Sequence, residues 1–175
     1  PHNIRYLRWE YIDFENHLIN IPASELKTRK PLTVPLATQA EIVLKDMHRL
    51  TGELEYVFVS SRGQNAKVVI PLSENTTTKA LQRLINPVTN NPFGVGYMTS
   101  HGFRHTASTM LNELGFDSDI IELQLAHIDK NQVRATYNKA QWMEKRIEMM
   151  QAWADYIDGL KSEGNVTPIN KRTSA

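Results

Sequence analysis

Four residues of this sequence, His101, Arg104, His127 and Tyr137, have types and spacing that could support phosphodiester chemistry. A guanidinium can bind two non-bridging phosphate oxygens at once, and imidazoles can transfer protons near neutral pH. A phenol can act as the nucleophile. Because its ordinary pKa is about 10, it needs positive neighbours to attack at pH 7. Together, the four side chains could attack a phosphodiester through a covalent tyrosine.

His101 and Arg104 are three positions apart, near the start of a helix that we expect from Thr99 to Leu114. This spacing puts both side chains on one face of the helix, and a helix N-terminus favours an anion nearby. Taken singly, the residues have ordinary interpretations. The pair would be a satisfied histidine and a surface arginine, His127 a capping or core histidine, and Tyr137 a packing residue.

His101 and His105 are four positions apart, which raises the question of a metal site. The metalloprotease motif requires Glu directly after the first His, and Gly102 stands there. No carboxylate spacing completes a ligand set, and the sequence has no cysteine. It also lacks a Gly-x-x-x-x-Gly-Lys-[Ser/Thr] motif. We therefore expect no metal site and a structural role for His105, and no motif of the sequence points to ATP or another cofactor.

The composition fits one globular domain, with 175 residues of which 41% are apolar and 22% are charged. The absence of a membrane-length apolar run, a signal segment and cysteines is compatible with a cytoplasmic protein. A net charge of +1 does not by itself indicate nucleic acid, so a DNA-binding face requires segregated charge. Basic residues gather at Lys27, Arg29 and Lys30, and acidic residues at Glu113, Asp117, Asp119 and Glu122.

The remaining pattern predicts helices and one short antiparallel sheet. Strands are expected at 11–14, 17–21 and 32–36, and Pro35 indicates that the third is at an edge or ending. Helices are expected at 2–9, 39–50, 73–85, 99–114, 118–126, 130–137 and 140–160. In the first of them Ile4, Leu7 and Trp9 should face inward, and Thr38 could cap the second.

The last expected helix carries two adjacent apolar stripes, which together form a broad apolar face. The first consists of Met143, Ile147, Met150, Ala154 and Ile157, and the second of Met149, Trp153, Tyr156 and Leu160. The simplest interpretation of this face is intramolecular core. Residues 162–175 lack periodicity and predict a flexible tail.

The order and spacing of the four chemical residues resemble a known family pattern: His-x-x-Arg, then Leu-[Gly/Ala]-His, then Tyr about ten positions on. Here the separations are three, twenty-three and ten, with Leu125-Ala126 before His127. This is similar to the catalytic domain of tyrosine recombinases, the phage integrase family. The local sequences at 126–129 and 135–140 look like those of integrases from satellite phages and prophage islands. The likeness extends from Asn3 to about Ile157.

The resemblance implies a mainly helical α+β fold with a small three-stranded antiparallel sheet, and a site-specific integrase that cuts and rejoins DNA. Tyr137 would be the nucleophile that forms a 3′-phosphotyrosyl bond. Arg104 and His127 would stabilise the charged phosphate, and His101 would assist as acid or base. The family carries a lysine about seven positions before a Val-Pro-Leu, which points to Lys27 as the general acid.

Lys30 is the second choice for that lysine, and Lys27, Lys30, Arg104 and His127 are the residues expected to contact DNA phosphates. The implied partners are double-stranded DNA at attachment sites and further copies of the full-length protein, in a tetramer. Many family members have Gly before the second histidine, and Ala126 is a small substitute for it.

One departure from the family pattern lies at the first residue. The family has another catalytic arginine in a helix, which would directly precede Pro1. We therefore expect residues 1–161 to be a catalytic-domain fragment that is inactive alone, followed by the tail. Two alternatives stay open. A type IB topoisomerase shares the chemistry, and a non-catalytic DNA-binding module would keep the fold without cleaving DNA.

Overall fold

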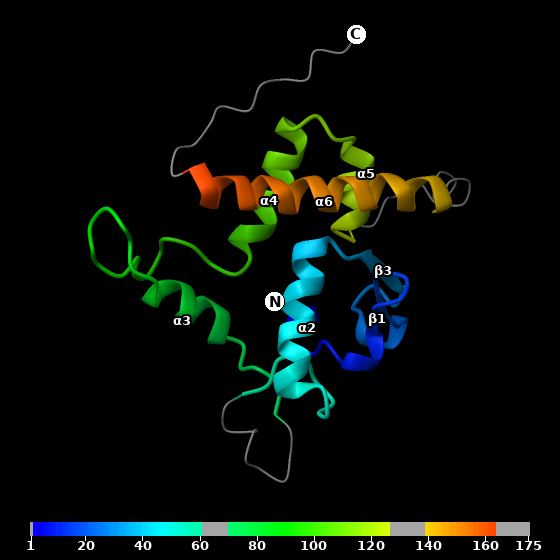
Figure 1. Ribbon diagram of the computed structural model, residues 1–175, viewed down its shortest axis with the longest axis horizontal. Coiled ribbons are helices and arrows are strands. Elements are labelled where there is room, and N and C mark those ends of the chain that lie inside the picture. The colour runs from blue at the N-terminus through cyan, green and yellow to red at the C-terminus, as the bar shows by residue number, and fades with distance from the viewer. Residues whose placement is uncertain (1, 61–69, 127–138, 164–175) are drawn as a thin grey trace. The chain divides into compact units, whose positions relative to one another are not determined.

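The computed structural model describes residues 2–60, 70–126 and 139–163. The elements follow one another as expected for a mainly helical α+β chain with one small sheet (Figure 1). They divide between two compact units. The first unit comprises residues 1–10 and 46–106, and the second comprises residues 11–45 and 107–175. The helix predicted at 130–137 and the tail from 164 onward lie outside the described residues.

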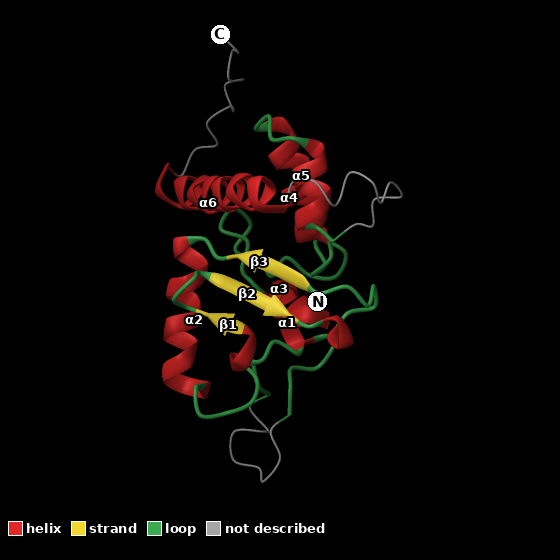
Figure 2. Cartoon of the chain, turned by 90° about the vertical axis from the view of Figure 1, so that its right-hand side faces the viewer, coloured by secondary structure: helices red, strands yellow, loops and turns green. Residues whose placement is uncertain are grey.

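The sheet belongs to the second unit and has the antiparallel order β1-β2-β3 (Figure 2). Its strands are β1 (Ile12–Asp13), β2 (Leu18–Ile21) and β3 (Leu32–Pro35), with Ile19 opposite both Ile12 and Val34. Strands β1 and β2 are shorter than predicted because residues 14–17 form the turn between them and Tyr11 belongs to a 3-10 helix, Trp9–Tyr11. In that turn the Asp13 carboxylate accepts the Asn16 backbone N–H at 2.9 Å and side-chain amide at 2.8 Å.

β3 is an edge strand of this sheet and ends at Pro35, which confirms the interpretation of Pro35 as a residue at the end of an edge strand. Leu36 N–H donates to the carbonyl of His17 at 2.8 Å, so these two residues form a hydrogen-bonded pair of the ladder. Bonded and non-bonded pairs alternate in an antiparallel sheet, which makes Asn20–Thr33 a non-bonded pair. The carbonyl of Thr33 therefore faces the open edge, away from β2.

The core of the second unit forms where three helices meet: α4 (Gly102–Glu113), α5 (Ser118–Gln124) and α6 (Lys139–Glu163). Leu111, Ile120, Ile121 and Met149 are buried together there, with Trp142, Met150 and Trp153 packed against them. Burying such side chains stabilises a fold by about 1.5–3 kcal/mol each. On α6, Met149 is thus core with Trp153 packed against it, whereas Ile147 is 48% exposed, Ile157 is 37% exposed and Leu160, at the end of the Met149 stripe, is 42% exposed.

Helix α2 (Thr38–Thr51) is joined to α6 by side-chain hydrogen bonds at its beginning. Thr38 is itself the first helical residue, and both its backbone N–H and its hydroxyl donate to the amide oxygen of Gln151, at 2.9 and 3.2 Å. Gln39 donates to Asp155 at 2.8 Å. A side chain of α6 therefore satisfies an N–H that would have no partner within α2.

In the first unit the chain leaves α1 (His2–Arg5) early and runs beside residues 55–57. Val57 N–H donates to the Leu7 carbonyl and Trp9 N–H to the Glu55 carbonyl, at 2.9 and 3.2 Å. The inward-facing pattern predicted for a helix over 2–9 is therefore only partly right, because Leu7 is buried but Ile4 is 54% exposed. A further helix in this unit, α3, spans Thr76–Arg83.

Candidate functional site

The beginning of α4 carries two of the predicted site residues. The helix begins at Gly102, later than predicted, because a turn precedes it in which Gly102 N–H donates to the carbonyl of Thr99 at 2.9 Å. His101 is the last residue before the helix, and its carbonyl accepts the backbone N–H of Arg104 at 3.1 Å. The turn therefore holds His101 and the half-buried Arg104 at one helix end, where partial positive charge favours an anion.

The ring of His105 stands almost perpendicular to that of His101, with 4.9 Å between their centroids. Both imidazoles are exposed. Among the described residues, no group of three metal-ligating side chains gathers here or elsewhere. Imidazole N–H groups and a guanidinium are hydrogen-bond donors that could bind a phosphate here.

Lys27 and Lys30 lie in the second unit, in the connection between the short 3-10 helix η2 (Ala23–Glu25) and β3. Arg29, between them, adopts a left-handed backbone with φ 49°, and its N–H donates to the Leu26 carbonyl at 2.9 Å. All three basic side chains are exposed. This tight turn thus presents three positive charges to solvent although the whole chain carries a net charge of only +1.

The predicted site residues His127 and Tyr137 lie outside the described residues. The elements on either side are described: α5 is followed by its capping residue Leu125, and α6 begins at Lys139. Ala126 has a left-handed backbone with φ 55°, which glycine adopts without strain. This conformation supplies a physical reason for a Gly at that position.

Sequence reasoning missed Arg146, which is only 5% exposed on the core face of α6. Its Nε donates to the Gln124 amide oxygen at 2.8 Å, and its Nη2 donates to the Thr33 carbonyl at 2.6 Å. Burial lowers the pKa of the guanidinium from its usual value. A signal was present, because Trp142, Arg146, Met149 and Trp153 follow the helical spacing of one buried stripe.

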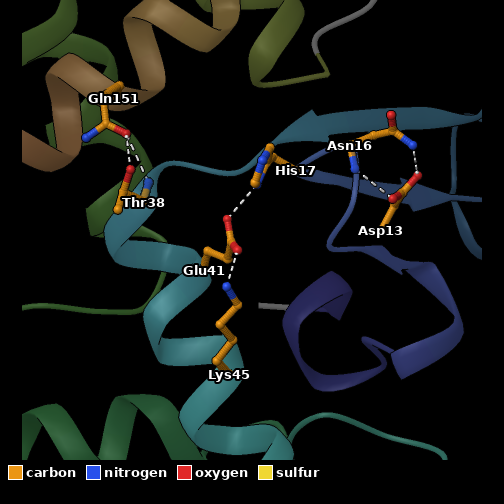
Figure 3. A network of polar contacts seen from close by, with 7 residues as sticks. All are labelled: Asp13, Asn16, His17, Thr38, Glu41, Lys45 and Gln151. Carbon is orange, nitrogen blue, oxygen red and sulfur yellow. Dashed lines mark hydrogen bonds and ion pairs between the residues drawn. The ribbon is translucent and has the colours of Figure 1, made fainter.

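A second polar network of the same unit surrounds Glu41 on α2 (Figure 3). His17 Nδ1 lies 2.7 Å from one carboxylate oxygen of this glutamate, and Lys45 Nζ lies 2.6 Å from the other. The hydrogen bond from Lys45 and then that from His17 lower the pKa of the Glu41 carboxyl from its usual 4.5. His17 has a φ of 57°, so the turn after β1 aims its ring at α2. This network fastens the sheet to α2 and has no evident part in chemistry.

No helix in the described ranges combines the length and the apolar character that crossing a bilayer requires. That finding agrees with the mixed polarity of α6, which is the longest helix described and carries charged residues throughout.

Comparisons with known proteins give a consistent result. The chain is 40% identical over 156 residues to "Prophage integrase IntA" of Escherichia coli K12, covering 89% of this chain and 35% of the relative. It is 38% identical to "Integrase" of Shigella phage Sf6, covering 89% and 37%. It is 34% identical over 174 residues to "Integrase" of Enterobacteria phage P4, covering 89% and 36%.

The chain thus spans little more than a third of the length of these curated relatives. No solved structure was found to match it. The model of the phage integrase family matches residues 1–143, a range that contains every predicted site residue and most of the described elements. The chain therefore belongs to the phage integrase family.

Proposed function

We propose that this chain is part of a site-specific DNA recombinase that integrates or excises a mobile element. The observation that carries the proposal is the family match over residues 1–143, which includes His101, Arg104, His127 and Tyr137 in their expected order. Relatives of phage and prophage origin, which carry the name integrase, support the same reading.

In this proposal Arg104 holds the phosphate to be cleaved, and His101 beside it assists as acid or base. The turn before α4 keeps them at one helix end, with the Arg104 N–H bonded to the His101 carbonyl at 3.1 Å. A guanidinium is suited to clamp two phosphate oxygens, and removing one such donor from a transition state typically slows a reaction about 10²–10³-fold. His101 is exposed, and an imidazole is a side chain suited to general acid–base catalysis.

Lys27 is proposed as the general acid, and Lys30 as a neighbouring phosphate contact. Both side chains are exposed in the turn before β3, where Arg29 adds a third positive charge. An alkoxide is a poor leaving group at neutral pH, so a positioned ammonium that protonates it accelerates cleavage, typically about 10²–10⁴-fold.

The proposed nucleophile is the phenolic oxygen of Tyr137, and His127 is a proposed donor to the phosphate. The phenol attacks phosphorus and passes its proton to His101, the proposed base, while the bond from phosphorus to the 5′ oxygen breaks. That oxygen takes a proton from Lys27 and leaves as a hydroxyl. The other strand end stays on the protein as a 3′-phosphotyrosyl ester. A 5′ hydroxyl from another strand reverses the step, so the bond energy is conserved and no cofactor is consumed.

The proposed partners follow from this reaction. The substrate is double-stranded DNA at the attachment sites of the element, and the exposed basic turn at 27–30 supports contact with a phosphate backbone. Strand exchange between two duplexes needs several active sites, so the full-length protein is proposed to act as a tetramer on DNA. The compartment of this reaction would be the cytoplasm, where the element's DNA lies.

The test uses the complete gene product that contains this chain, with DNA that carries the ends of the element. A protein–DNA adduct that survives denaturation should form with the wild type and not with Tyr137→Phe. An equal adduct in both would move the nucleophile to another residue. If DNA binding is intact and neither protein forms an adduct, the proposal is wrong and a non-catalytic DNA-binding module explains the fold.

A further inference from the structure

Arg146 is more deeply buried than any other charged side chain in the part of the chain that the structure describes. Figure 2 shows its helix, α6, beside the β3 edge of the sheet. The guanidinium reaches two other elements. Nη2 donates to the Thr33 carbonyl of β3 at 2.6 Å, and Nε donates to the Gln124 side chain at the end of α5 at 2.8 Å.

Stability alone gives little reason for an arginine at this position. Both acceptors are uncharged, and moving a guanidinium out of water costs free energy that neutral acceptors offset only in part. The burial that lowers the pKa of Arg146 is the same desolvation. Trp142, Met149 and Met150 flank it on the core face of α6, so an apolar side chain would simply continue the stripe. Replacing buried ionic groups by apolar ones is often neutral or stabilising.

The geometry gives a better reason. The planar guanidinium carries its N–H donors in a fixed fork, so two acceptors bound by it are held at one separation and angle. One of them, the Thr33 carbonyl, faces the open edge of the sheet, where no strand partner is available among the described residues. The other belongs to the last residue of α5. Arg146, on α6, therefore fixes the positions of α5 and the β3 edge relative to α6.

Each of these three elements adjoins a residue of the proposed site. β3 begins five positions after Lys27, α5 ends three positions before His127, and α6 begins two positions after Tyr137. A shift of one element against another would therefore move one proposed catalytic group against the rest. A misplacement of about 1 Å can slow an enzyme reaction about 10²-fold.

We propose that Arg146 is a positioning residue for DNA strand cleavage, which it serves by locking α5, α6 and the edge of β3 in one arrangement. The role rests on the proposed recombinase function. Arg146 acts through the residues that those elements carry and does not itself touch DNA.

The experiment measures the rate of covalent adduct formation at saturating DNA, using the complete gene product. Gln124→Met removes the acceptor with little change in volume, Gln124→Glu keeps an acceptor oxygen, and Arg146→Lys keeps the charge without the fork. Gln151→Met is the matched control. It removes an α6 amide that bonds Thr38 and Gln39 of α2 instead of α5 or β3. Thermal unfolding and DNA affinity are measured for each variant.

We expect Gln124→Met and Arg146→Lys to slow adduct formation about 10²-fold while DNA affinity stays within about twofold. Gln124→Glu should restore most of the rate, and Gln151→Met should leave it near that of the wild type. If Arg146→Lys does not fold, Gln124→Met still tests the proposal, because it leaves the guanidinium in place.

Folded Gln124→Met protein that cleaves at the wild-type rate would overturn the proposal. An equal loss of cleavage rate in Gln151→Met would also overturn it, because the effect would then come from a general loosening of α6. A wild type that forms no adduct is a different outcome. It refutes the recombinase function, and with it the reaction that Arg146 would serve.

Discussion

The stability lost on truncating Met149 should show that this residue lies on the core face of α6. The Met149 side chain has no exposed surface and packs among Leu111, Ile120 and Ile121. Met→Ala at a fully buried site removes transfer free energy and leaves a cavity, which together cost about 2–5 kcal/mol. Because three helices hold this cluster and can collapse little, we expect Met149→Ala to lower the free energy of unfolding by about 3 kcal/mol. For a chain of this length, that loss lowers Tm by roughly 6–12 °C.

Ile147→Ala is the matched control, two positions away on the same helix. Its side chain is 48% exposed, so truncation removes only about half of the burial, and the better helix propensity of Ala offsets part of that loss. We expect a cost below about 1 kcal/mol. Urea titration followed by tryptophan fluorescence is the assay, because Trp142 and Trp153 lie against the core. Similar costs for the two variants would refute this placement of the core.

Three further predictions concern other parts of the second unit. Glu41→Gln should destabilise the chain at neutral pH. The folded pKa of the carboxyl is lowered from 4.5 by Lys45 and His17, so its contribution is present above that value and is lost as pH falls through the lowered pKa. Unfolding curves at several pH values check this, and a difference between wild type and variant that grows in acid would contradict it. Lys27→Met should slow adduct formation about 10²–10⁴-fold on ordinary DNA. On DNA whose leaving 5′ oxygen is replaced by sulfur the defect should largely vanish, because a thiolate, with a thiol pKa of about 8.5, leaves without a proton; an undiminished defect would exclude the general-acid role. Ala126→Gly should stabilise the chain by about 0.5–1 kcal/mol in urea titration, since a left-handed backbone strains Ala more than Gly; a loss of stability would contradict the strain.

Local patterns predicted the positions of the strands and most helices because turn residues and apolar periodicity are local signals. Pro35 marked the end of an edge strand correctly, since it cannot donate to a ladder. The failure at Ile4 has a non-local cause. Pairing with residues 55–57 ends α1 at Arg5 and turns the chain before the apolar pattern can act as a helix face.

The site could be predicted only in pieces. The three-residue spacing of His101 and Arg104 is a local property: His101 directly precedes α4, and Arg104 lies in its first turn. The proposed role of Arg146 could not be read from its stripe, because its acceptor, the Thr33 carbonyl, is 113 positions away in the sequence. The assignments of His127 and Tyr137 rest on the family pattern, since these two residues lie outside the described part of the chain.

The central claim, cleavage of DNA by Tyr137, is tested most directly by identifying the amino acid bound to DNA. Trypsin cuts after Arg134 and Lys139, so the nucleophile would lie in the peptide Ala135–Lys139, whose single tyrosine is Tyr137. The adduct is trapped on attachment-site DNA, digested with nuclease and trypsin, and fragmented in a mass spectrometer. We expect this peptide to carry a nucleotide through a 3′-phosphate on the phenolic oxygen. The same nucleotide on any other peptide, with Ala135–Lys139 recovered unmodified from the adduct, would contradict the claim.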